Sequence, residues 1–171
     1  ETPFEHSVFK FHIKCPIFVA RQWFRHRIAS YNEISGRYTE MKDECCLPEQ
    51  LRQQKTRNYK YELVDSEKNA ELLQKVSDHY DASFALYQEL LDQGVAKEHA
   101  RIVLPLSLYT QFYWTINTRA LMNFLNLRME EHAQYEIREY ANAINDVFKD
   151  KMPWSHEAFM KYVVSGDKWA E

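Results

Sequence analysis

Four arginines and one histidine gather in the stretch RQWFRHRIASYNEISGRYTE, residues 21–40. A guanidinium donates two parallel hydrogen bonds to a phosphate and never loses its charge near neutral pH. Gly36 stands between Ser35 and Arg37 in a chain with only 3 glycines, and a turn there would let backbone N–H groups approach an anion closely. The stretch therefore predicts a local pocket for a doubly charged phosphate. Its cations are Arg21, Arg25, Arg27 and Arg37, with His26 beside them.

Two other interpretations of this stretch remain open at the level of sequence. A segment of this kind is more often a solvated surface with ion pairs, and it could also line a groove for nucleic acid. Asn32 and Glu33 stand among the arginines, and Glu33 would repel a phosphate backbone. Cation, carboxylate and amide together are more typical of a site for a nucleotide, which presents a phosphate, a sugar and a base.

The composition limits the class of protein that carries this site. The chain has 171 residues, 45% of them hydrophobic and 15% aromatic, which is enough for one globular domain with a core. Its 22 basic and 25 acidic residues argue against a surface that grips nucleic acid as a whole. Three cysteines, two of them adjacent, favour a reduced compartment, so we expect a cytoplasmic protein. No signal peptide, membrane span or metal-binding spacing is recognisable, so we expect no membrane, nucleic acid or metal partner.

The elements that must position the stretch show clear periodicity. Alternation predicts strands over 8–14 and 108–116, and Pro16 suits the first turn of a helix over 16–24. Apolar residues at helical spacing predict a long helix between Ser66 as N-cap and Gly94 as stop. Further helices are expected over 96–104, over 118–128 after an Asn117 cap, over 133–148 and from Ser155, whereas 41–63 predicts only a polar connection or lid. This pattern is typical of one α+β domain in which a few strands pack under long helices.

Arg25, His26, Arg27 and Ser35 in RHRIASYNEIS resemble the signature of flavin-dependent thymidylate synthases, which is Arg-His-Arg followed by seven residues and Ser. HARIVLPLSLYTQFYWTINTRALMNFLNLR and EEHAQYEIREYANAI also resemble the second half of that family, so the likeness covers most of the chain outside its middle. It implies an α+β fold with a small, mostly antiparallel sheet against long helices, in a homotetramer with shared active sites. The family carries a further N-terminal segment before ETPFEH, so residues 1–171 are expected to form a single catalytic domain that lacks it.

The resemblance also implies an activity and two sets of contact residues. The family makes dTMP from dUMP, with methylenetetrahydrofolate as carbon donor and NADPH as reductant through FAD. By similarity, the FAD contacts are Thr2, Arg25, His26, Arg27, Glu33, Asn117, Thr118, Arg119 and Asn123. The dUMP contacts are, likewise by similarity, Gln22, Trp23, Phe24, Arg25, Glu33, Ile34, Ser35, Gly36, Arg37, Arg101 and Arg128.

Arg128 is the candidate catalytic residue. A pyrimidine becomes nucleophilic at C5 only if negative charge can build on its N3–C4–O4 edge, and a fixed guanidinium stabilises such charge. Because an arginine side chain keeps its proton in proteins, Arg128 cannot act as a general acid, so its role is electrostatic. Ser35 has no recognisable His–Asp pair to activate it and is assigned to binding, while reduced flavin supplies the hydride.

Helical spacing raises one question about these assignments. Arg119, Asn123 and Asn126 share one face of the predicted helix. Arg128 lies about 140° further round than Asn123, at about 100° per residue. If both residues contact ligands, either the helix ends near Leu127 or the two serve different active sites of the oligomer.

Plainer roles and rival functions stay open for the same residues. Taken singly, Asn117 would be a helix cap, Arg101 would balance a helix dipole, and Arg128 would pair with Glu131. A flavin- or nucleotide-binding protein without turnover is the main rival to an enzyme. A basic nucleic-acid module is a third possibility, and it would bind polynucleotides with a steep salt dependence.

Overall fold

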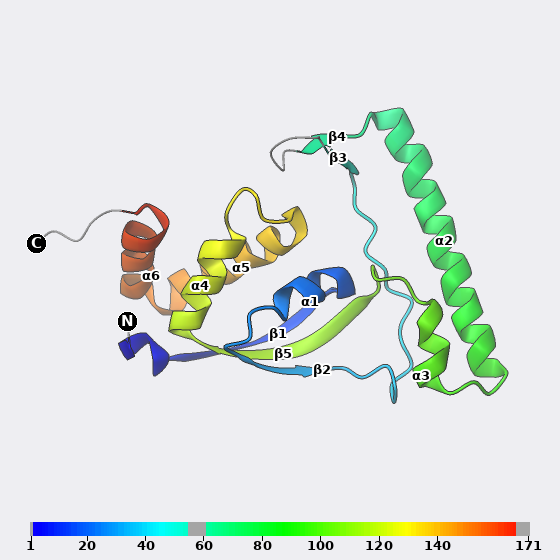
Figure 1. Cartoon of the computed structure of the whole chain (residues 1–171), viewed down its shortest axis with the longest axis horizontal. Coiled ribbons are helices and arrows are strands. Elements are labelled where there is room, and N and C mark those ends of the chain that lie inside the picture. The colour runs from blue at the N-terminus through cyan, green and yellow to red at the C-terminus, as the bar shows by residue number, and fades with distance from the viewer. Residues whose placement is uncertain (1, 55–60, 167–171) are drawn as a thin grey trace, which may run out of the picture. The chain divides into compact units, whose positions relative to one another are not determined.

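The computed structural model describes residues 2–54 and 61–166, and its contacts divide the chain into two compact units (Figure 1). Unit 1 contains residues 2–11, 23–31 and 114–166. Unit 2 contains residues 12–22, 32–54 and 61–113. Three strands have residues in both units, namely β1 (Val8–Pro16), β2 (Ser30–Glu33) and β5 (Tyr109–Asn117).

These strands form a sheet with the order β1-β5-β2. In unit 1 the Thr118 amide donates to the Ser7 carbonyl at 2.9 Å, and in unit 2 the Ile17 amide donates to the Leu108 carbonyl at 2.9 Å. The start of β1 therefore pairs with the end of β5, and the end of β1 pairs with the start of β5, so these two strands are antiparallel. Residues 110, 112, 114 and 116 of β5 are buried in alternation, which confirms the predicted strand.

Unit 1 is built around aromatic side chains. Trp23 is completely buried, and its ring lies 5.1 Å from that of Phe124 and 5.2 Å from that of Trp114. Such stacked and edge-on pairs add about 0.5–1.5 kcal/mol each to the burial of their area. Of these rings, Phe124 lies on α4 (Thr118–Arg128), Trp114 on β5, and Trp23 at the end of α1 (Ile17–Trp23). The other helices of unit 1 are η1 (Thr2–Glu5), α5 (Tyr135–Lys151), α6 (Pro153–Phe159) and η3 (Met160–Val164).

Three helix predictions for unit 1 can be compared with the structure. Asn117 caps α4 as predicted, because its side chain accepts a hydrogen bond from the Ala120 amide at 2.9 Å. Helical spacing predicted a stripe of Ala133, Ile137, Tyr140, Ile144 and Phe148. α5 buries Ile137, Ile144 and Phe148 of this stripe together with Ala141, whereas Tyr140 is half-buried and Ala133 lies before the helix begins. α6 begins at Pro153, two residues before the predicted start, since proline is well suited to the first turn of a helix.

Unit 2 carries α1 (Ile17–Trp23), which ends at the boundary with unit 1, and the long helix α2 (Ser66–Asp92). The predicted N-cap Ser66 is wrong by one residue. The Asp65 carboxylate accepts hydrogen bonds from the amides of residues 67 and 68 at 3.1 and 3.4 Å, so Asp65 is the cap. The helix ends before Gly94, whose φ of +80° suits glycine.

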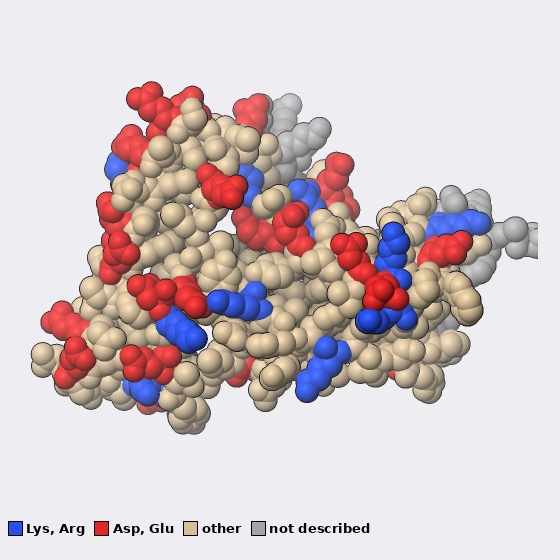
Figure 2. Space-filling view, turned by 180° about the vertical axis from the view of Figure 1, so that it is seen from behind, with Lys and Arg blue, Asp and Glu red and all other residues tan. Residues whose placement is uncertain are grey.

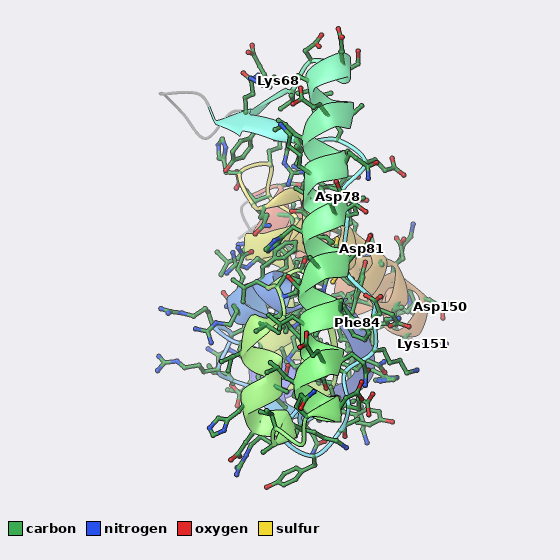
Figure 3. All side chains as sticks on the ribbon, turned by 90° about the vertical axis from the view of Figure 1, so that its right-hand side faces the viewer. Lys68, Asp78, Asp81, Phe84, Asp150 and Lys151 are labelled. Carbon is green, nitrogen blue, oxygen red and sulfur yellow. The ribbon has the colours of Figure 1, made fainter. Side chains whose placement is uncertain are left out.

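One flank of α2 is acidic. Figure 2 shows Asp and Glu side chains gathered along this helix, and Figure 3 shows Asp78 and Asp81 near its middle. The exposed acidic residues of α2 are Glu67, Glu71, Asp78, Asp81, Glu89 and Asp92. Two short helices follow it, α3 (Lys97–Ala100) and η2 (Arg101–Val103).

The middle of the chain is more ordered than its sequence indicated. β3 (Arg52–Gln54) pairs antiparallel with β4 (Tyr61–Leu63), and residues 55–60 of the expected lid lie outside the described part. Before this hairpin, the Cys46 amide donates to the Ser107 carbonyl at 2.9 Å. The bond between Cys46 and Ser107 joins residues 61 positions apart, which local periodicity cannot reveal. Among residues 2–54 and 61–166, no helix is long and apolar enough to cross a membrane.

Candidate functional site

Unit 1 contains a cavity of about 840 Å³, which we call the arginine cavity. Its wall combines η1, the loop that follows α1 and part of α4. Its size lies in the range of about 300–1,000 Å³ that is usual for small-molecule and cofactor sites. The lining residues are Glu5, Arg25, His26, Arg27, Ile28, Asn117, Arg119, Ala120, Asn123, Leu127 and Arg128.

The loop that carries the Arg-His-Arg motif is anchored to the core of unit 1. The His26 amide donates to the Trp23 carbonyl at 3.0 Å, and the Tyr31 hydroxyl donates to the His26 carbonyl at 2.7 Å. Burial raises the pKa of Tyr31, so its hydroxyl keeps the proton that it donates. Because Trp23 is fully buried, the loop starts from a fixed point and projects its cations into the cavity.

The charges around the arginine cavity are unbalanced. Its wall holds four arginines and one carboxylate, Glu5, which forms an ion pair with Arg119. Within the described residues, neither Arg25 nor Arg27 has a carboxylate or hydrogen-bond partner for its guanidinium. Unpaired cations in a concave site create a positive potential that favours an anionic ligand. The amides of Asn117 and Asn123 add donors of the kind that polar ring edges require.

Arg128 and His26 form the best-defined polar contact of this cavity. The Nε–H of Arg128 donates to Nε2 of His26 at 2.9 Å, and the His26 ring meets Phe124 edge-on at 4.9 Å. Burial first and the Arg128 charge second lower the pKa of His26 from 6.5 to about 4, so the ring is neutral at pH 7. Burial also lowers the pKa of Arg128, which reflects partial removal of this cation from water.

Helical spacing left two alternatives for Asn123 and Arg128, either a helix that ends near Leu127 or two separate active sites, and the structure agrees with the first. Both residues line the arginine cavity of a single chain. α4 ends at Arg128, the last residue of the predicted range 118–128, and its last turn places Leu127 and Arg128 in the same wall. A cavity that wraps the end of a helix accepts side chains from more than one face, so separate active sites are not needed to explain the two residues.

Six of the nine residues expected at FAD line this one cavity: Arg25, His26, Arg27, Asn117, Arg119 and Asn123. Thr2 is exposed in η1 and is not part of the wall. Thr118 is completely buried, and its hydroxyl donates to the Ser7 carbonyl at 3.3 Å. That hydroxyl therefore ties α4 to the start of β1. Glu33 belongs to unit 2.

The residues expected at dUMP are divided between the two units. Arg25 and Arg128 line the arginine cavity, while the Trp23 ring is part of the core. Phe24 is half-buried, with its ring 4.9 Å from that of Tyr31. The other members lie in unit 2: Gln22, Glu33, Ile34, Ser35, Gly36, Arg37 and Arg101.

A second cavity of about 350 Å³, the Gly36 cavity, lies in unit 2. It is lined by Ile17, Glu33, Ile34, Gly36, Met41, Glu98, Arg101, Ile102, Leu104, Pro105, Leu106, Leu108 and Thr110. A Cβ on Gly36 would lie 3.1 Å from Sδ of Met41 and 3.2 Å from Cδ of Arg101, so glycine permits close packing there. Glu33 accepts a hydrogen bond from the Thr110 hydroxyl at 2.6 Å.

The Ser-Gly-Arg sequence forms a tight turn next to this cavity. The Ser35 carbonyl accepts from the amides of residues 38 and 39, and its hydroxyl accepts from the Arg37 amide at 3.3 Å. Arg37 pairs with Glu98 at 3.0 Å. The predicted turn is therefore present, whereas one of its cations already has a carboxylate partner.

Three residues of the two sites carried no signal in the sequence. Glu5 neutralises Arg119, Tyr31 fixes the motif loop, and Thr110 holds the Glu33 carboxylate. Strand alternation placed Thr110 on the buried side of β5, which was the one available hint. Among the described residues, no group of three or more His, Cys, Asp or Glu side chains is arranged to hold a metal ion.

Comparison with known proteins gives one consistent family. The family model for thymidylate synthase complementing protein matches residues 1–154. A flavin-dependent thymidylate synthase of Thermosipho africanus is 54% identical over 169 residues, which cover 98% of this chain and 74% of that protein. The corresponding enzyme of Thermotoga neapolitana is 56% identical over 167 residues, covering 98% and 73%.

Solved structures agree with the sequence comparison. The UMP/dUMP methylase PolB of Streptomyces cacaoi, bound with 5-Br UMP, superposes with a TM-score of 0.88 at 38% identity. The match covers 93% of this chain and 75% of that one. The family predicted from the Arg-His-Arg signature is confirmed: the chain belongs to the flavin-dependent thymidylate synthases.

Proposed function

We propose that this chain is a flavin-dependent thymidylate synthase that converts dUMP to dTMP by reductive methylation. Methylenetetrahydrofolate is the carbon donor, and NADPH is the reductant through FAD. The observation that carries the proposal is the arginine cavity, where Arg25, Arg27 and Arg128 share one wall and no carboxylate within the described residues neutralises them. Its relatives bear the names flavin-dependent thymidylate synthase and UMP/dUMP methylase, which supports the same substrate class.

The residues of the arginine cavity fit a flavin cofactor. Arg25 and Arg27 are exposed on the motif loop, and neither has an ion-pair partner among the described residues. Their guanidinium groups are therefore available to bind the pyrophosphate of the cofactor. Asn117 uses its side-chain oxygen to cap α4, which leaves its NH2 group to donate to a ligand. When bound, the flavin supplies the hydride that completes the methyl group. The protein's part is to bind and orient it.

Arg128 stabilises the substrate as charge builds on the N3–C4–O4 edge of the pyrimidine. A guanidinium that is partly removed from water acts more strongly on such charge than one in bulk solvent. Arg128 remains a cation throughout, so it moves no proton. His26, neutral at pH 7, leaves that positive charge at full strength.

The turn at residues 35–37 and Arg101 are proposed to bind the dUMP phosphate. Gly36 allows the backbone to approach closely, and Arg101 lines the same cavity. We further propose a cytoplasmic homotetramer with active sites shared between subunits, in which residues 1–171 act as one catalytic domain. The free thiols of Cys15, Cys45 and Cys46 are compatible with the reduced compartment that we propose.

Tritium release from dUMP labelled at C5 tests the proposal directly. The assay contains FAD, NADPH and methylenetetrahydrofolate, and each is omitted in turn. Release that requires all three supports the proposed reaction. Release without flavin would contradict it, and dUMP binding without any release would favour a nucleotide-binding protein that lacks turnover. Molar mass from light scattering during gel filtration tests the tetramer, and a monomer mass at assay concentration would reject it.

A further inference from the structure

We propose that His26 is a positioning residue for Arg128. Its neutral ring, with the proton on Nδ1, accepts the Nε–H of Arg128 and so leaves both terminal amino groups of that guanidinium for the substrate pyrimidine. This inference rests on the proposed function, because it concerns the residue to which the activation of dUMP was assigned. It gives the histidine of the motif a role in orientation in addition to any contact with flavin.

The hydrogen bond itself determines the tautomer. Arginine has only donors, so the Nε2 atom that lies 2.9 Å from Arg128 Nε must be the acceptor. The ring proton is then on Nδ1. Within the described residues, the guanidinium of Arg128 has no other hydrogen-bond or ion-pair partner, so its two terminal nitrogens keep all their donors. Arg128 lines the arginine cavity, where those donors are available to a ligand.

His26 is a rigid acceptor because three contacts hold it. Its amide donates to Trp23, its carbonyl accepts from Tyr31, and its ring packs edge-on against Phe124 at 4.9 Å. Trp23 and Phe124 are fully buried and stack on each other. A long arginine side chain loses rotamer freedom when it binds a ligand, and a fixed partner removes part of that entropic cost in advance.

The surroundings of His26 keep it neutral. The charged groups of the cavity wall are Arg25 and Arg27 on its own loop, Arg119 and Arg128 on α4, and Glu5 on η1. Tyr31, the other titratable group in contact, has a raised pKa and is uncharged at neutral pH. Burial and the Arg128 charge bring the pKa of His26 to about 4. A protonated ring would offer a donor where Arg128 needs an acceptor, so the pair would separate below about that pH.

Two substitutions separate positioning from packing. In His26→Gln the side-chain carbonyl can occupy the place of Nε2 and accept from Arg128. In His26→Leu a side chain of similar volume packs against Phe124 but accepts nothing. We expect the turnover of His26→Leu, measured by tritium release at saturating dUMP and normalised to bound flavin, to fall about tenfold or more. His26→Gln should stay within about threefold of the wild type. Equal losses in both variants would overturn the proposal.

Nitrogen NMR of the histidine ring tests the same idea without turnover. The protein is labelled with ¹⁵N-histidine, and the His26 signals are identified by their absence from His26→Gln. We expect a protonated Nδ1 and an unprotonated Nε2 in the wild type across pH 5–8. In Arg128→Leu the tautomers should mix and the pKa of His26 should rise, because the neighbouring cation is gone.

The NMR experiment and the tritium-release assay test the positioning role and the proposed function separately. A proton on Nε2 in the wild type, or a tautomer unchanged in Arg128→Leu, would overturn the positioning role even if the enzyme is active. Loss of tritium release in the wild type would reject the proposed function while leaving the tautomer result intact. If His26→Leu does not fold, wild type and Arg128→Leu still decide the question by NMR.

Discussion

The two cavities differ in the pairing of the cations in or beside them. In the arginine cavity of unit 1, Arg25 and Arg27 have no carboxylate partner within the described residues. Beside the Gly36 cavity of unit 2, Arg37 is paired with Glu98 at 3.0 Å. An unpaired cation repels its neighbours and contributes little to stability, so its charge is available to a ligand. A paired cation is largely neutralised, so Arg37 offers less charge to a ligand than Arg25 or Arg27 does.

The first cavity also has the firmer support. Its motif loop begins directly after Trp23, whose buried ring stacks on that of Phe124. The Ser35–Arg37 turn is instead held by its own backbone hydrogen bonds. Catalytic geometry must be kept within a fraction of an ångström, and rigid elements do this better than loops. The comparison supports our proposal that electrostatic catalysis takes place in unit 1 and that unit 2 contributes shape-dependent substrate binding.

Arg128→Ala should produce the largest effect. Removal of a preorganised group that stabilises charge in the transition state typically costs about 10²- to 10³-fold in rate. We expect tritium release to fall by that amount while flavin absorbance of the purified protein persists. Lys75→Ala is the matched control, because Lys75 forms only an exposed ion pair with Glu71 on α2. Activity above a third of the wild type in Arg128→Ala would reject its assigned role.

Arg27→Ala and Arg37→Ala test the difference in pairing. Loss of the unpaired Arg27 should weaken flavin binding about tenfold and leave the free energy of unfolding unchanged or slightly higher. Loss of the paired Arg37 should lower the free energy of unfolding by up to about 1 kcal/mol. Flavin titration and urea unfolding measure the two quantities. The contrast fails if both variants lose stability equally.

The neutral His26 predicts a pH dependence of stability. Its folded pKa of about 4 lies below its ordinary value of 6.5, so the unfolded chain takes up the proton first as pH falls. The free energy of unfolding should therefore decrease between about pH 6.5 and 4, by about 1–2 kcal/mol once solvent screening of a half-buried ring is allowed for. His156, whose pKa is also lowered, contributes equally in a His26→Gln control. Urea unfolding at pH 7 and 4.5 should show a smaller loss in that control, and parallel curves would contradict the prediction.

Gly36→Ala should have the smallest effect and should act on binding. The new Cβ would press on Met41 and on the side chain of Arg101, so we expect the KM for dUMP to rise about threefold with kcat little changed. Gly94→Ala is the control with the opposite expectation. A Cβ on Gly94 would have no atom within 4 Å, but the φ of +80° at this position is unfavourable for alanine. The substitution should lower stability by about 1 kcal/mol and leave KM unchanged. If both variants have the same KM for dUMP, the proposal that dUMP binding depends on the shape of the Gly36 cavity is wrong.

Local signals in the sequence were enough for most of the fold. The alternation in β5, the Asn117 cap of α4 and the buried stripe of α5 were all predicted and are present. Each depends on neighbours within a few residues, where backbone geometry fixes the period. The cap of α2 moved from Ser66 to Asp65 because two adjacent residues can both accept hydrogen bonds and only the finished backbone selects one.

By itself, the sequence determined the family and the kinds of residue at the site. The Arg-His-Arg motif and Ser35 identified a chain that does belong to the flavin-dependent thymidylate synthases. Only the tertiary structure decided which cations remain unpaired and which meet in one cavity. The bond from Arg128 to His26 joins residues 102 positions apart, and the pairing of Arg119 with Glu5 joins residues 114 apart. Such contacts depend on how the whole chain folds back on itself, because no local period links residues that far apart.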